Sequence, residues 1–119
     1  MNAPKAKGTR WETAVVEYLR MAGVPHAERR ALNGAGDQGD IAGLPGIVIE
    51  AKNCRTVDLA GWLDEAETER ANARADVGVA WHHRRGKSSP GQGYVTMTGE
   101  TFVALLRAAG YIWGDGGQS

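Results

Sequence analysis

The chain has 119 residues, of which 42% are hydrophobic and 24% are charged, and its formal net charge is zero. These values predict one globular domain and exclude a disordered or fibrous protein. There is no apolar run of the roughly 18–20 residues that a membrane span needs, no signal peptide is expected, and the single cysteine, Cys54, excludes an internal disulfide and a four-cysteine zinc site and fits a reducing cytoplasm.

The first half of the chain is predicted to contain a helix, an extended stretch and two strands. Residues 1–8 are interpreted as a flexible basic arm, and apolar residues at helical spacing predict a helix over residues 9–22. Thr9 and Glu12 match the capping-box pattern, and Gly23 is a natural helix end. An extended stretch over residues 25–32 and a loop over 33–36 precede two short strands, 39–43 and 47–53, around a turn centred on Pro45.

The second half is predicted to alternate helices and strands. A helix over residues 57–74 precedes a strand at 77–81, a basic loop at 83–91, a strand at 94–98 and a last helix that Thr98 caps and Gly110 ends. Residues 114–119 are predicted to be a disordered tail. The expected fold is therefore a single α/β domain, residues 9–113, in the order α-β-β-β-α-β-β-α, with a mixed central sheet flanked by helices.

Side-chain patterns also predict which helix faces are buried. The helix over residues 57–74 is expected to bury an apolar stripe and to expose an acidic side, and the last helix is expected to bury its own apolar stripe. The first stripe consists of Leu59, Trp62, Leu63 and Ala66, the acidic side of Asp64, Glu65, Glu67 and Glu69, and the last stripe of Phe102, Leu105, Leu106 and Ala109.

The two strands around Pro45 carry the residues most suggestive of chemistry. Asp40 and Glu50 are equidistant from Pro45, which predicts that they are cross-strand neighbours with Cβ atoms about 4.5–5.5 Å apart. Two carboxylates this close repel each other unless a cation lies between them, and Mg²⁺ takes such oxygen ligands. Strand alternation places Lys52 on the face of Glu50, where an ammonium can orient or deprotonate a metal-bound water. Glu12, from the first helix, is expected to lean over the same site.

Structural explanations of the same residues remain open. Glu12 fits a helix cap as well as a catalytic acid, and the two roles are compatible. Asp40 is also a common turn residue, and Glu50 and Lys52 also fit a surface ion pair worth about 0–1 kcal/mol. His82 and His83 are adjacent on a strand and point to opposite faces, so they are not expected to bind one ion together.

The ordered pattern resembles the PD-(D/E)XK nuclease superfamily, and within it the archaeal-type and phage Holliday-junction resolvases. The resemblance runs from Gly8-Thr9-Arg10-Trp11-Glu12 through Gly39-Asp40-Ile41 to Ile49-Glu50-Ala51-Lys52, with Gly39 where the motif has proline. It implies a restriction-endonuclease-like fold, metal ligation by Asp40, Glu50 and the backbone carbonyl of Ala51, a water-positioning Lys52, and Glu12 as an additional catalytic acid. It also implies Mg²⁺ as cofactor, with Mn²⁺ able to substitute, and a homodimer.

Basic residues before, between and after these motifs are candidate phosphate contacts, although charge runs are also common on solvated surfaces. The candidates are Lys5, Lys7, Arg10, Arg29, Arg30, Arg55, Arg84, Arg85 and Lys87. The expected function is Mg²⁺-dependent, structure-selective hydrolysis of branched or duplex DNA, most of all junction resolution, in the cytoplasm or nucleoid of a bacterial or phage-infected cell. The alternatives are another nuclease of the superfamily (nicking, restriction-like or repair), an inactive nucleic-acid-binding module of this fold, and a regulatory protein that binds a partner through its acidic helix.

Overall fold

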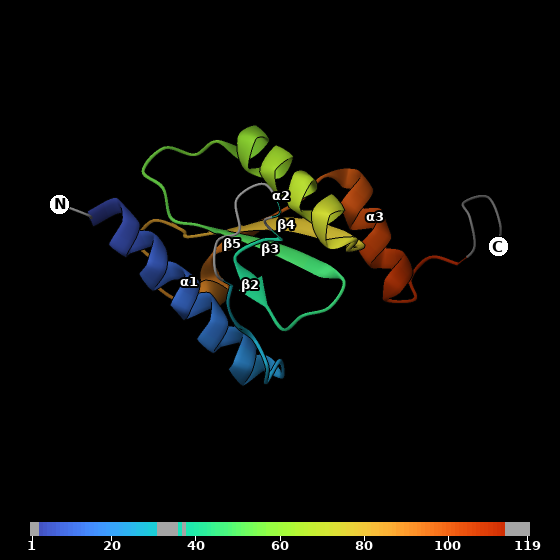
Figure 1. Ribbon diagram of the computed structural model, residues 1–119, viewed down its shortest axis with the longest axis horizontal. Helices are drawn as coiled ribbons and strands as arrows, with labels where there is room; N and C mark the ends of the chain where they lie inside the picture. Colours follow the sequence, from blue (N-terminus) through green and yellow to red (C-terminus); the bar gives the residue numbers. More distant parts are fainter. Residues whose placement is uncertain (1–2, 31–35, 37, 114–119) are drawn as a thin grey trace.

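The computed structural model describes residues 3–30, 36 and 38–113, and these form three helices around short strands (Figure 1). The predicted order of elements is confirmed. The elements are α1 (Ala3–Ala22), β1 (Glu28–Arg29), β2 (Ile41–Ala42), β3 (Ile47–Lys52), α2 (Leu59–Ala73), β4 (Val77–His82), the 3-10 helix η2 (Pro90–Gln92), β5 (Tyr94–Thr96) and α3 (Gly99–Ala108).

The central sheet is mixed, as expected for an α/β fold. Its strand order is β3-β4-β5, with β3 and β4 parallel and β4 and β5 antiparallel. The parallel pair needs a crossover, and α2 provides it. β1 and β2 form a separate two-stranded antiparallel sheet.

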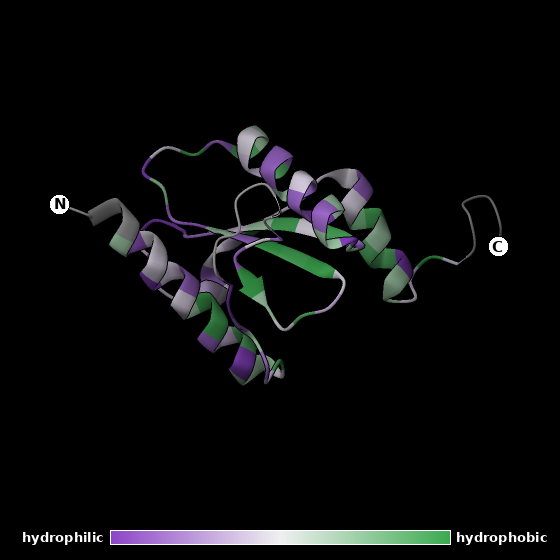
Figure 2. Cartoon of the chain, in the orientation of Figure 1, coloured by the Kyte–Doolittle hydropathy of each residue, from purple (hydrophilic) through white to green (hydrophobic). Residues whose placement is uncertain are grey.

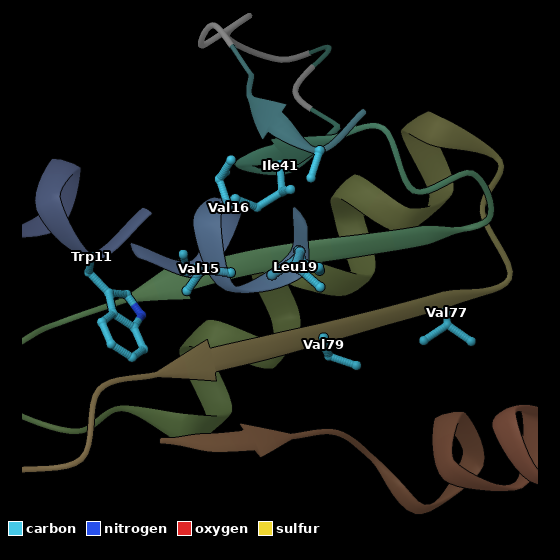
Figure 3. Close-up of a cluster of buried hydrophobic side chains, with 10 residues drawn as sticks. Trp11, Val15, Val16, Leu19, Ile41, Val77 and Val79 are labelled. Carbon is cyan, nitrogen blue, oxygen red and sulfur yellow. The ribbon is translucent and has the colours of Figure 1, made fainter. Parts of the chain in front are cut away.

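Two helices cover opposite faces of the central sheet. Trp11, Val15 and Leu19 of α1 pack with Ile49 of β3 and Val79 of β4 in the main core (Figure 3). Alternate residues of the strands face α2 instead. There Gly78 allows a close approach, because a Cβ at that position would lie 2.9 Å from the carbonyl oxygen of Ala66. β3 is hydrophobic for most of its length, as is typical of a strand that is covered on both faces (Figure 2).

The start of α1 differs from the prediction. The helix begins at Ala3, so residues 3–8 are helical rather than a flexible arm, and Thr9 lies inside the helix and does not cap it. The capping-box interpretation of Thr9 and Glu12 is therefore wrong. Residues 1–2 and the predicted tail, 114–119, lie outside the described residues.

The turn and cap predictions elsewhere are better. Gly23 follows α1 with a φ of 118°, which favours glycine. Thr98 caps α3 by accepting from the N–H of Thr101, as predicted. Asp58, which was not predicted to be a cap, caps α2 by accepting from the N–H of Gly61. The helix predicted to begin at Val57 therefore begins two residues later.

The last helix is less buried than its apolar pattern predicts. Every residue of α3 is at least partly exposed, and Phe102 and Val103 are exposed by 52% and 40%. Leu59 of α2, also predicted to be buried, is exposed by 40%. The main core is filled largely by α1, β3 and β4, and it leaves part of the apolar surface uncovered. No helix among the described residues is long and apolar enough to cross a membrane.

Candidate metal and phosphodiester site

Asp40 is fastened to β3 by two hydrogen bonds on either side of Glu50. Its backbone N–H donates to the carbonyl of Ile49 at 2.9 Å, and its Oδ2 accepts the N–H of Ala51 at 2.8 Å. The predicted hairpin pairing of Asp40 directly with Glu50 is therefore not the observed register. β2 is only two residues long and pairs with β1. Asp40 therefore contacts β3 through one backbone bond and one side-chain bond, and not through a regular pair of backbone bonds.

This attachment also orients the backbone of Ala51. The N–H and C=O groups of one strand residue point to the same edge of the strand. Because the N–H of Ala51 points to Asp40, its carbonyl faces the Asp40 edge too, away from β4. The carbonyl that the resemblance implies as a metal ligand is thus on the side of the Asp40 carboxylate.

Glu50 and Lys52 project from β3 toward α2. Glu50 is 2% exposed, and its Oε1 lies 3.5 Å from the Nζ of Lys52. The same Nζ lies 2.8 Å from Oε1 of Glu65, on the exposed side of α2. Burial disfavours the charged form of Lys52, but the hydrogen bond to Glu65 and the charge of Glu50 outweigh it and raise its pKa to about 12. Lys52 is therefore an ammonium at neutral pH.

The pKa of Asp40 is shifted by burial and by its charged and hydrogen-bonding neighbours. Burial, then the negative charge of Glu50, raises the pKa of Asp40 to about 7. The charge of Glu12 acts in the same direction, while the N–H of Ala51 and the charge of Lys52 oppose the shift. Glu12, Glu50 and Lys52 therefore lie near enough to Asp40 to act on one carboxyl group.

A further buried acid, Glu69 of α2, completes the site. Its position in the sequence predicted that it lies on the polar side of the helix. Glu69 is 4% exposed and faces Glu50. Burial, together with the hydrogen-bonded and charged carboxyl of Glu69, raises the pKa of Glu50 to about 9. The spacing of Glu69 from the buried residues Trp62 and Ala66, seven and three positions earlier, places it on the core stripe. That spacing is the signal that would have identified it.

The donor set fits a divalent cation. Glu50, Glu65 and Glu69 each offer one oxygen within 4.8 Å of the others. Without a cation, the raised pKa keeps a proton on Glu50 at neutral pH, and that proton serves its hydrogen bond with Glu69. A bound cation would take the place of this proton, and Oε2 of Glu50 has no other hydrogen-bond partner among the described residues. Carboxylate oxygens gathered in this way match the preference of Mg²⁺ and similar hard cations. The predicted set of Asp40, Glu50 and the carbonyl of Ala51 shares Glu50 with this cluster.

Glu12 lies at the edge of the site with a specific partner. Its Oε1 accepts from Nε of Arg29 at 3.0 Å, and the two side chains are exposed by 22% and 46%. Glu12 thus pairs with β1 rather than with the helix terminus. Arg29, which is also a predicted phosphate contact, holds this acid.

The other predicted phosphate contacts divide into two groups. Lys7, Arg55, Arg84 and Arg85 line one pocket at the end of the central sheet. The remainder are scattered: Arg10 is exposed on α1, Arg30 lines a smaller pocket beside Gly46, Lys87 closes a tight turn onto Arg84, and the side chain of Lys5 lies outside the described part of the chain.

The two adjacent histidines point to opposite faces, as predicted. The ring of His82 packs on Trp62 and Tyr94, and its Nε2 lies 2.7 Å from Oγ1 of Thr96. The ring of His83 packs edge-on against Trp11. Burial lowers the pKa of His82, which therefore stays neutral near pH 7.

Comparison of the chain with models of protein families, with curated protein sequences and with solved structures found no match.

Proposed function

We propose that this protein is a Mg²⁺-dependent, structure-selective DNA endonuclease of restriction-endonuclease-like topology, and that its substrate is a branched DNA such as a Holliday junction. The observation that carries the proposal is the attachment of Asp40 to β3 on both sides of Glu50, with the ammonium of Lys52 beside the pair. A fully buried acid and a half-buried acid beside a fixed cation at the end of a strand are costly for stability, which favours a functional role.

The chain's own groups divide the work of phosphodiester hydrolysis. Asp40 and Glu50, with the carbonyl of Ala51, would hold the metal, which when bound activates water and neutralises developing charge. Lys52 carries its proton at neutral pH, so its role is to orient the attacking water or a phosphate oxygen by donating hydrogen bonds. Glu65 accepts from the amine of Lys52 and fixes its direction.

Resolution of a junction also requires two copies of this site, because two symmetric strands are cut. We propose a homodimer. The exposed apolar side chains of α3, among them Phe102 and Val103, are consistent with a covered surface, since they lack partners within the described core. Sedimentation of the wild type and of Phe102→Asp tests this: a dimer that the substitution converts to a monomer supports it, and a wild-type monomer contradicts it.

The decisive experiment compares three DNA substrates. Purified protein is incubated with a four-way junction, a linear duplex and a nicked duplex of matched sequence, with Mg²⁺ or with EDTA. Paired symmetric cuts in the junction alone, dependent on the metal, are the expected result. Cleavage of all three substrates would indicate a different nuclease activity, and binding without cleavage under Mg²⁺ and Mn²⁺ would indicate an inactive binding module.

Variants connect the activity to this site. Asp40→Asn and Lys52→Ala are expected to abolish cleavage while circular dichroism and junction binding stay near wild type. Asp64→Asn, which neutralises an exposed carboxylate of α2, is the matched control and should cut normally. Wild-type rates for Asp40→Asn or Lys52→Ala would remove that residue from the mechanism.

A further inference from the structure

A large basic pocket lies beyond the carboxyl ends of the parallel strands β3 and β4. Its volume is about 1140 Å³, and its walls come from the start of α1, the β3–α2 connection, the end of β4 and β5. These segments meet at the end of the molecule where α1 begins (Figure 1). In open α/β sheets, ligands bind at this edge of parallel strands.

The pocket has the electrostatics of a site for an anion. Lys7 enters from α1, Arg55 from the β3–α2 connection, and Arg84 and Arg85 from the end of β4. Every charged side chain among the described residues that line it is basic. The acidic residues of α2 lie outside its walls, so a polyanion is drawn to this pocket and repelled from the neighbouring helix.

The pocket also contains an aromatic platform. The ring of Tyr94, 50% exposed, lies in the β5 wall. The guanidinium of Arg84 lies over it, 5.6 Å from the ring centroid, and His82 packs on it from β4. Unpaired bases stack on aromatic rings and on the planes of arginine guanidinium groups. Arg84 and Tyr94 together offer such a surface.

The sheet register connects this platform to the proposed catalytic lysine. Lys52 pairs with His82 across β3 and β4, and His82 pairs with Tyr94 across β4 and β5. The three residues form one row across the sheet. Because neighbouring strands are about 4.7–4.9 Å apart, Tyr94 lies two strand spacings, roughly 10 Å, from Lys52.

We propose that this pocket binds unpaired nucleotides of the DNA substrate, with phosphates on its arginine and lysine side chains and a base stacked on the Tyr94–Arg84 platform. A duplex keeps its bases stacked on one another, so it would contact only the cations and leave the platform unused. The site therefore selects DNA whose bases are unpaired or unstacked beside the cut, as at a branch point. The inference rests on the proposed function for its substrate class, but binding at the pocket does not require cleavage.

Binding is therefore measured with EDTA present, by fluorescence anisotropy of labelled oligothymidylate, of an abasic oligomer of the same length and of a duplex. Wild type should bind oligothymidylate more tightly than the abasic oligomer. Tyr94→Ala should weaken oligothymidylate binding about fivefold to a hundredfold, leave the abasic oligomer unaffected, and be rescued by Tyr94→Phe. Tyr111→Ala, which removes a 79% exposed tyrosine outside the pocket, is the matched control and should bind as wild type.

Arg84→Ala gives a second test at an exposed position where folding is not at risk. It should weaken the binding of both single-stranded oligomers. It should also reduce the slope of log affinity against log salt concentration by about 0.7, which corresponds to the loss of one phosphate contact. Wild-type affinity of Tyr94→Ala for oligothymidylate, or an equal loss for the abasic oligomer, would overturn the inference. Tyr94-dependent binding by a protein that never cleaves DNA would support the pocket and contradict the proposed function alone.

Discussion

The carboxyl groups of Glu50 and Glu69 face each other between β3 and α2, with 2% and 4% of their residue surfaces exposed. Buried carboxyls in contact are stable only when one carries a proton or when a cation neutralises them. The nearest cation in the described part of the chain, Lys52, is shared between Glu50 and exposed Glu65. The stability of the fold is therefore expected to depend both on pH and on divalent cations.

Stability of the metal-free protein is expected to fall as pH rises from about 4 to about 9. The pKa values of Asp40 and Glu50 rise from ordinary values of 3.8 and 4.5 to about 7 and about 9 on folding. Within that window the folded state binds more protons than the unfolded state, so its stability is complete below the unfolded pKa and is lost as pH passes the folded pKa. A tenfold change in proton affinity corresponds to about 1.4 kcal/mol, so the combined loss amounts to several kcal/mol. Thermal unfolding in EDTA, followed by circular dichroism from pH 5 to 9, measures it.

Glu50→Gln should flatten that pH dependence, because the amide supplies a donor to Glu69 and does not ionise. Glu67→Gln is the matched control. Glu67 lies on the exposed side of the same helix as Glu69, and hydrogen bonding to Arg70 lowers its pKa. Removing the Glu67 carboxylate should therefore leave the fall in stability with rising pH unchanged. A wild-type melting temperature that is constant over this range would contradict the repulsion between the buried acids.

A divalent cation should reverse the loss at alkaline pH. Ligand that binds only the folded state stabilises by about 2.7 kcal/mol at one hundred times its dissociation constant. Mg²⁺ or Mn²⁺ titrated at pH 8 should therefore raise the melting temperature of wild type and have little effect on Glu50→Gln. Equal shifts in both proteins would show that the cation acts elsewhere.

Variants of Glu12 and Arg29 distinguish a catalytic role of Glu12 from a structural one. Their partly exposed ion pair should contribute only about 0–1 kcal/mol to stability. If the proposed function holds, Glu12→Gln slows junction cleavage, while Arg29→Met, which breaks the same pair but keeps the carboxylate, retains it. Single-turnover cleavage rates of the two variants decide this. Equal slowing would mean that Glu12 acts only by holding Arg29.

The sequence could predict the elements because their patterns are local. Apolar spacing identified the helices, the run at Ile47, Val48 and Ile49 identified a strand buried on both faces, and Thr98 marked a helix start. The sequence also predicted that Asp40, Glu50 and Lys52 lie in one region, and all three are on or next to β3.

Long-range choices could not be predicted in the same way. Whether β2 pairs with β3 or with β1 depends on tertiary contacts, and a two-residue strand has almost no pattern to fix its register. The burial of Glu69 is visible as spacing but contradicts the ordinary preference of a charged residue for solvent. Likewise Thr9 matches a cap, but α1 continues through it to Ala3.

Gly39 has a backbone conformation that positions the neighbouring Asp40, and its replacement should reduce both stability and cleavage. Its φ is 99°, and a Cβ there would lie 2.9 Å from Cγ1 of Val48 and 3.2 Å from the carbonyl oxygen of Ile49. Proline, which the superfamily motif has at this position, fixes φ near −65° and does not fit this backbone. Gly39→Ala should therefore cost about 2–4 kcal/mol and shift Asp40 away from the N–H of Ala51.

Gly86→Ala is the matched control for this substitution. Gly86 also has a positive φ, 82°, but nothing lies within 4 Å of its Cβ position, so only the backbone strain of about 1–2 kcal/mol applies. Urea denaturation gives the two losses of stability, and cleavage is compared at temperatures where both variants are folded. A larger loss for Gly39→Ala in both assays is expected, because Gly39 sets the approach of Asp40 to β3. Equal losses of stability, or wild-type cleavage by Gly39→Ala, would show that the close approach at Gly39 does not position Asp40.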